Sequence, residues 1–96
     1  MALKNEGEKE KASFKIYVDR ERGSIDLRGD DLILSIAGGS RTIKQSYVVG
    51  FDKTCDMALN KVGVTMSFYD FFGNKETREF AMLENDYRVL KKILKK

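Results

Sequence analysis

In residues 62–69 four large apolar side chains alternate with Gly63, Thr65, Ser67 and Tyr69, and this alternation constrains the fold more than any other feature of the sequence. Its main apolar members are Val62, Val64, Met66 and Phe68. A period of two places these side chains on one face of a β-strand, so the sequence predicts a strand with one buried face. The same period recurs in residues 14–18, 24–27, 32–36 and 76–82. The chain is therefore predicted to consist mainly of antiparallel strands.

Short glycine-containing segments separate the first strands. They predict turns at residues 21–23, 29–30 and 38–40. Four residues of the longer strand that follows are predicted to share one buried face: Ile43, Tyr47, Val49 and Phe51. Residues 52–61 fit either a short helical turn or a strand, and their pattern does not distinguish the two.

The turn of the last hairpin is expected to contain three residues, Gly73 to Lys75. This register pairs Phe68 with Phe80. A two-residue turn would instead place Glu79 opposite Phe68 and direct a charge into the apolar face. Because a shift of one residue inverts every side chain of a strand, the three-residue turn is the expected one.

The last residues of the chain change to a helical period. Their apolar stripe consists of Leu83, Tyr87, Leu90 and Leu94, widened by Val89 and Ile93. An N-cap is expected at Glu84 or Asn85. Asp86 lies in the first turn and lysines crowd the last turn, and both placements favour the helix dipole. The sequence predicts an amphipathic helix over residues 85–95.

Together these patterns predict an α+β fold. An antiparallel meander of about six or seven strands is expected to form a partly open barrel, closed by one C-terminal amphipathic helix. Residues 13–96 are expected to be a single domain, and residues 1–12, which are mostly charged, a flexible tail. Eleven residues are expected to form the core: Ile16, Leu32, Leu34, Ile43, Val49, Val64, Met66, Phe68, Phe80, Leu90 and Leu94.

The residue types that catalysis and metal binding need are scarce. The chain has no histidine and one cysteine, so a zinc ligand set or a nucleophile–histidine pair has no source. Cys55 is expected to be an ordinary half-buried thiol. The segment 38–41 (Gly-Gly-Ser-Arg) could hold a phosphate, although a hairpin is expected there. We therefore expect no enzyme activity, cofactor or metal. The single cysteine and the lack of a long apolar segment suggest a cytoplasmic location.

An aromatic cluster is the first candidate binding surface. Strand alternation places Tyr69 and Phe71 on the face opposite Met66 and Phe68, with Phe72 beside them at the hairpin tip. Exposed aromatic clusters often mark protein contacts, so these rings are expected to bind another protein, or a second copy in a homodimer. The alternative is that another part of the chain covers them.

The basic end of the helix is the second candidate. The net charge is +3, and the excess lies in residues 83–96. Its basic residues are Arg88, Lys91, Lys92, Lys95 and Lys96. They are expected on the solvated face of the helix, where they could contact an anionic membrane surface. Nucleic-acid binding is not expected from so small a net charge.

The spacing of apolar residues over residues 14–95 resembles the pleckstrin-homology-like (PH-like) superfamily, which includes the GRAM and bacterial PH domains. The segments that carry the resemblance are 24–27 leading into 31–36, then 41–51, the hairpin 62–82 and the helix 85–95. Residues 41–51 also resemble the PH-like part of the archaeal taxis protein family CheF. The basic signature of phosphoinositide-binding PH domains is not visible, since Arg20, Arg22 and Arg28 alternate with acidic residues.

The resemblance to the PH-like superfamily implies a partly open barrel closed by a helix, and the resemblance to the taxis family implies an adaptor role between proteins. We therefore expect a non-enzymatic module that binds another protein. The alternative is a module that binds a membrane surface or an anionic lipid through the basic helix.

Overall fold

The computed structural model of the protein describes residues 11–96. Within this range it contains seven β-strands, one turn of 3-10 helix and one α-helix. The elements are β1 (Lys11–Val18), β2 (Glu21–Arg28), β3 (Asp31–Ile36), β4 (Gly39–Lys44), η1 (Gln45–Tyr47), β5 (Val48–Asp56), β6 (Lys61–Tyr69), β7 (Lys75–Leu83) and α2 (Glu84–Leu94). Most of the expected tail, residues 1–12, lies outside the described residues, while Lys11 and Ala12 belong to β1.

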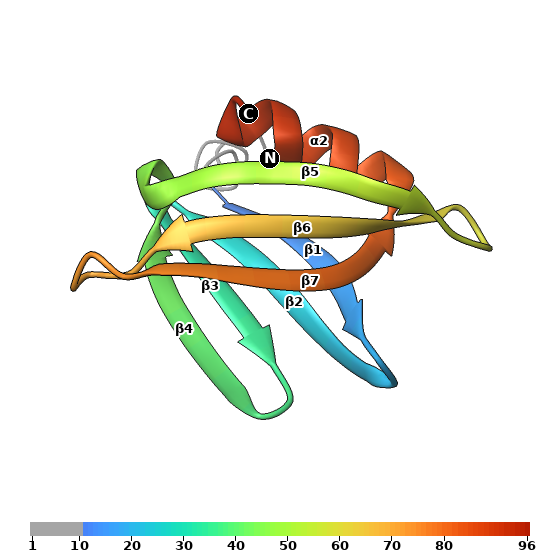
Figure 1. Ribbon diagram of the computed structural model, residues 1–96, viewed down its shortest axis with the longest axis horizontal. Helices are drawn as coiled ribbons and strands as arrows, with labels where there is room; N and C mark the ends of the chain where they lie inside the picture. Colours follow the sequence, from blue (N-terminus) through green and yellow to red (C-terminus); the bar gives the residue numbers. More distant parts are fainter. Residues whose placement is uncertain (1–10) are drawn as a thin grey trace, which may run out of the picture.

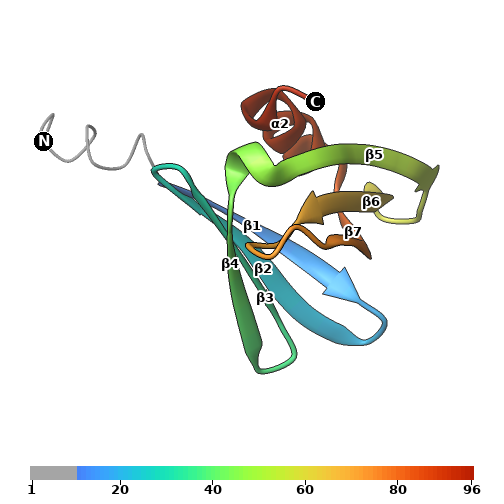
Figure 2. The ribbon, with the colours of Figure 1, turned by 60° about the vertical axis from the view of Figure 1, so that its left-hand side comes forward.

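The seven strands form one antiparallel sheet in the order β4-β3-β2-β1-β7-β6-β5. Two meanders, β1–β4 and β5–β7, are joined where β1 meets β7, and these two strands share a single paired position, Tyr17 with Ala81. The two halves therefore cross obliquely, and α2 lies over one side of them (Figures 1 and 2). The predicted fold class, an α+β antiparallel barrel that is partly open and closed by one C-terminal helix, is confirmed.

The inner faces of both meanders supply the core, together with two residues of α2. Its buried members are Phe14, Ile16, Ile25, Leu27, Leu32, Leu34, Ile43, Val48, Phe51, Val62, Val64, Met66, Phe68, Phe80, Met82, Leu90 and Leu94. All of the expected core residues except Val49 are among them. The alternation of the strands therefore predicts the core well.

The prediction for Val49 is wrong, because the strand expected over 41–51 is interrupted. The 3-10 turn η1 separates β4 from β5, and a bulge follows between Val48 and Gly50. The bulge directs Val48 into the core opposite Phe68 and leaves Val49 exposed. An added residue in a strand inverts the side chains on either side of it, which periodicity alone does not reveal.

The prediction of a three-residue turn between β6 and β7 is also wrong. The loop has five residues, Asp70 to Asn74, so Phe68 lies opposite Glu76 and Phe80 lies opposite Val64. The parity of the prediction was right, since Phe68 and Phe80 both remain buried. The longer loop arises because the Asp70 side chain bonds to its main chain, as described below.

Other boundaries also differ from the expected ones. The first turn is Asp19-Arg20, and residues 21–23 belong to β2. Residues 52–56 continue β5, which resolves the ambiguous segment as a strand followed by a turn. The helix begins at Glu84, with Leu83 in the N-cap position and exposed rather than in the buried stripe.

Helix α2 packs on the core with Leu90 and Leu94 and also covers the free edge of β5. The main-chain N–H of Lys53 donates to the Tyr87 hydroxyl (3.0 Å), and the Lys91 ammonium donates to the carbonyl of Phe51 (2.7 Å). The helix thereby satisfies main-chain groups of an edge strand that would otherwise face solvent. Within residues 11–96, no helix is long and apolar enough to cross a lipid bilayer.

Candidate functional site

The loop between β6 and β7 carries the most exposed aromatic side chains among residues 11–96. It projects from the body of the protein (Figure 1). Phe72 is 90% exposed, Phe71 60% and Tyr69 40%. The ring of Tyr47 meets that of Phe71 edge to face, with centroids 5.8 Å apart. We call these four residues the aromatic tip. The expected exposure of Tyr69, Phe71 and Phe72 is confirmed, whereas Tyr47, expected on one strand face with Ile43 and Phe51, is half-buried beside them.

A single carboxylate holds the loop of the aromatic tip in shape. Asp70 Oδ1 accepts the main-chain N–H groups of Phe72 and Asn74, each at 2.8 Å. The main chain closes the same loop, since Asp70 N–H donates to the Asn74 carbonyl (2.9 Å) and Gly73 N–H to the Asp70 carbonyl (3.1 Å). Gly73 adopts a positive φ of 86°, which glycine tolerates without strain. The main-chain hydrogen bond from Asn74 is the largest influence that lowers the pKa of Asp70.

A network of charged residues behind the loop ties it to β4. Arg41 donates two hydrogen bonds to Glu76, one of them 2.6 Å long from Nη1 to Oε1, and lies 3.8 Å from Asp70. Arg78 donates to the same Glu76 Oε1 at 2.8 Å. Both guanidinium groups lie over the ring of buried Phe68, at 5.7 and 5.9 Å. The hydrogen bond from Arg41 is the main cause of the lowered pKa of Glu76. Hydrogen bonds and ion pairs among these charged residues thus support the loop of the aromatic tip.

The aromatic tip presents mainly apolar surface to solvent. Its exposed groups are rings, and the nearby carboxylates of Asp70 and Glu76 are already engaged in hydrogen bonds. Within residues 11–96, no three His, Cys, Asp or Glu side chains are grouped so that they could hold a metal ion. Cys55, expected to be half-buried, is exposed near the end of β5.

The basic end of α2 is partly engaged within the protein. Arg88 forms an ion pair with Glu84 (2.9 Å), and Lys91 bonds to β5 and lies 3.6 Å from Asp52. The other expected basic residues, Lys92, Lys95 and Lys96, are exposed. A shallow depression on the helix is lined by Tyr87 and all five basic side chains. Of the five residues expected to contact an anionic surface, Arg88 and Lys91 have partners within the protein, and all except Lys91 are exposed.

Helix α2 also exposes apolar side chains that the sequence pattern assigned to its buried stripe. Val89 is 49% exposed and Ile93 40% exposed. Helical spacing places them on one side of the helix, next to Lys92. This exposed side of α2 is therefore more apolar than the sequence pattern predicts.

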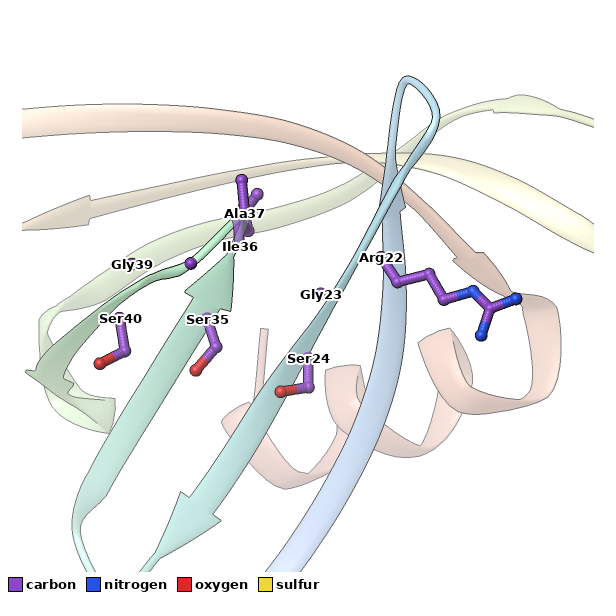
Figure 3. Close-up of a pocket in the computed structure, with 9 residues that line it drawn as sticks. Arg22, Gly23, Ser24, Ser35, Ile36, Ala37, Gly39 and Ser40 are labelled. Carbon is purple, nitrogen blue, oxygen red and sulfur yellow. The ribbon is translucent and has the colours of Figure 1, made fainter.

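The glycine-rich turn before β4 does not form a phosphate cradle. Ala37 and Gly38 make a two-residue hairpin turn with positive φ angles of 52° and 82°. Figure 3 shows the hydroxyls of Ser24, Ser35 and Ser40 pointing to one side from three adjacent strands, while Arg22 extends away from them. A phosphate cradle needs convergent N–H groups and a cation, and here Arg41 is instead bound to Glu76.

The comparison with protein-family models finds no match to this chain, and the comparison with curated proteins finds none either.

Sequence reasoning found the three exposed rings of the aromatic tip but missed Tyr47 and Asp70. An aspartate followed by Gly-Asn within a few residues is a known turn pattern, and that signal was available for Asp70. Tyr47 gave no comparable signal, because its position depends on the 3-10 turn η1.

Proposed function

We propose that this protein is a non-enzymatic protein-interaction module, an adaptor that binds its partner through the aromatic tip. The observation that carries the proposal is that Phe71 and Phe72 are largely exposed on a loop whose main chain is fixed by Asp70. A fully buried phenylalanine contributes about 1.5–3 kcal/mol relative to an exposed one, so two solvated rings forgo a substantial stabilisation. A partner that covers them recovers it.

The fixed loop also favours binding. A flexible loop loses conformational freedom when a partner orders it, and this loss weakens the complex. The hydrogen bonds of Asp70 order the aromatic tip before any partner arrives. Aromatic residues, phenylalanine among them, are enriched at the centre of protein interfaces.

The architecture is compatible with the PH-like superfamily, of GRAM or bacterial PH type, in which we propose to place the chain. Seven antiparallel strands in two crossed meanders, followed by one closing helix, agree with the architecture that the resemblance implies. The adaptor role comes from the resemblance of residues 41–51 to the taxis family and is part of the same proposal. We also propose a cytoplasmic location, since a chain with one cysteine suits a reducing compartment.

A comparison of three forms of the full chain tests the proposal. The wild type, Phe71→Ser/Phe72→Ser and Leu59→Ser are immobilised and exposed to a lysate of the source cells. Leu59 is the matched control, because it is a largely exposed apolar residue on the turn at the other end of β6. A partner should be retained by the wild type and by Leu59→Ser, and lost from the double variant. Equal retention by all three forms would refute the role of the aromatic tip.

The second candidate function is binding to an anionic membrane surface through α2. The exposed Val89 and Ile93 beside Lys92 favour it, since apolar residues flanked by lysines are typical of helices that lie at a membrane interface. Sedimentation with phosphatidylserine vesicles tests it at low and high salt. This function requires binding that falls with salt and is lost in Lys92→Gln/Lys95→Gln/Lys96→Gln. Salt-independent binding or no binding excludes it.

A further inference from the structure

The two edges of the sheet are treated differently. The edge of β5 is covered by α2 through Tyr87 and Lys91, and two bulges interrupt the strand. Within residues 11–96, β4 has main-chain ladder hydrogen bonds with β3 alone. Its pairing with β3 is regular over all six residues, and the chain contains no proline. Bulges, proline, a covering helix and charged side chains commonly protect an edge strand. In the described structure β4 has only the last of these, and its two charged residues are paired within the chain, Arg41 with Glu76 and Lys44 with Asp31.

The hairpin geometry identifies the main-chain groups on this edge. The two-residue turn makes Ile36 and Gly39 a hydrogen-bonded pair, and such pairs alternate along an antiparallel ladder. The bond from Gln45 N–H to the Asp30 carbonyl (2.8 Å) continues the same alternation. The residues between these pairs therefore direct their N–H and C=O groups away from β3. They are Ser40, Thr42 and Lys44, and all three are exposed.

We propose that two copies of this chain join along this edge, pairing β4 antiparallel to β4 about a two-fold axis at Thr42. Thr42 then lies opposite the partner's Thr42, and Ser40 lies opposite the partner's Lys44. Each of the three pairs exchanges two main-chain hydrogen bonds, so about six bonds join the copies. The β1–β4 meander of one copy and the β1–β4 meander of the other then form one continuous sheet across the interface.

The charges of β4 fit a second copy in this register. Centring the axis on Lys44 would place two ammonium groups opposite each other, which is unfavourable. Centring it on Thr42 places each lysine opposite a serine hydroxyl. Lys44 is also held by Asp31 of its own chain at 3.1 Å, and this ion pair raises its pKa and partly neutralises its charge at the interface. β-Branched threonine is among the residues that pair well across strands.

Reciprocal charge variants at the axis test the dimer. Sedimentation of the full chain at low salt, from about 1 to 500 µM, covers micromolar dissociation constants. Thr42→Lys and Thr42→Glu each place like charges opposite each other, and each should raise the dissociation constant about tenfold or more. An equimolar mixture of the two should restore the dimer, because lysine then faces glutamate. Thr42→Val keeps the N–H and should dimerise like the wild type.

Restoration by the mixture also demonstrates that both variants fold. A monomeric wild type over the whole concentration range would overturn the proposal. So would dimers of Thr42→Lys as tight as those of the wild type, or a mixture that stays monomeric. A dimer that persists in Thr42→Lys but is lost in Phe71→Ser/Phe72→Ser would place the interface on the aromatic tip instead.

Discussion

The carboxylate of Asp70 accepts a hydrogen bond from the main-chain N–H of Phe72 at 2.8 Å. Phe72, the most exposed aromatic residue among residues 11–96, therefore lies on a loop whose main chain is held by a side chain of the same loop. The same oxygen also bonds to the N–H of Asn74. Together with the contacts of Arg41, these bonds connect the aromatic tip to the strand β4 on the other meander. Asp70 and Arg41, rather than the aromatic residues themselves, therefore determine where the rings lie.

Replacing Asp70 with alanine should loosen the aromatic tip without unfolding the barrel. The N–H groups of Phe72 and Asn74 lose their acceptor, so their amide hydrogen exchange should speed up at least tenfold relative to core amides. Asp70→Asn retains one acceptor oxygen and should show a smaller increase. Unchanged exchange at both amides in Asp70→Ala would contradict the role given to this carboxylate.

The stability of the protein should fall in acid, partly through Asp70 and Glu76. Their folded-state pKa values are lowered, chiefly by the hydrogen bonds from Asn74 and Arg41 respectively. Each carboxylate therefore contributes its full stabilisation above the unfolded-state pKa, about 3.9 for Asp and 4.3 for Glu, and loses it as the pH falls through the lower folded-state value. Melting temperatures between about pH 7 and 2 measure this loss.

A double variant isolates the contribution of these two residues. Asp70→Asn/Glu76→Gln should flatten the decline in melting temperature below about pH 5, because neither replacement titrates there. If its decline is as steep as that of the wild type, other carboxylates carry the acid sensitivity.

Truncating Phe68 should come close to unfolding the protein. Its ring is fully buried opposite Val48, and Arg41 and Arg78 lie over it. Replacing a buried phenylalanine with alanine costs about 3–5 kcal/mol, against a total stability of about 5–15 kcal/mol for most domains. Urea unfolding of Phe68→Ala checks this. A folded variant with an unchanged midpoint would contradict the packing of this face.

A methyl group at position 23 should destabilise the sheet. A Cβ added to Gly23 would lie 2.4 Å from the carbonyl oxygen of Ser35. Because this oxygen belongs to the main chain of β3, the clash can be relieved only if β3 shifts. Gly23→Ala should therefore cost about 1–3 kcal/mol. Gly39→Ala is the control, since its nearest atom would be 3.8 Å away. Equal thermal stability of the two variants would show that β2 and β3 are less closely packed than described.

Much of the fold follows from the sequence because alternation decides which face of a strand is buried. Phe68 and Met66 enter the core for this reason, and Tyr69 is exposed by the same rule. Val49 escapes the rule because a bulge shifts its strand. The register of β6 and β7 escapes it too, since a five-residue loop and a three-residue loop preserve the same parity. What decides between them is the hydrogen bonding of Asp70, a local interaction that periodicity does not contain.

The candidate site was predictable to a similar degree. Phe72 is exposed at the hairpin end, as expected. Phe71 was expected on the strand with Tyr69, but β6 ends at Tyr69 and Phe71 lies in the loop. The contact of Tyr47 with Phe71 depends on η1. This turn contains no glycine or proline, so the sequence does not predict it. The exposed Val89 and Ile93 were misassigned because a helical stripe wider than its docking surface leaves one side in solvent.

Photo-crosslinking at the aromatic tip tests the proposed contact surface most directly. A photoreactive benzoylphenylalanine replaces Phe72 in one form of the full chain and Leu59 in another, and each form is irradiated in the source cells. Both positions are largely exposed, so they differ in location rather than in accessibility. A distinct protein cross-linked from position 72 and absent from position 59 is the predicted result. No product from position 72, or the same products from both positions, would contradict the assignment of the aromatic tip as the binding surface.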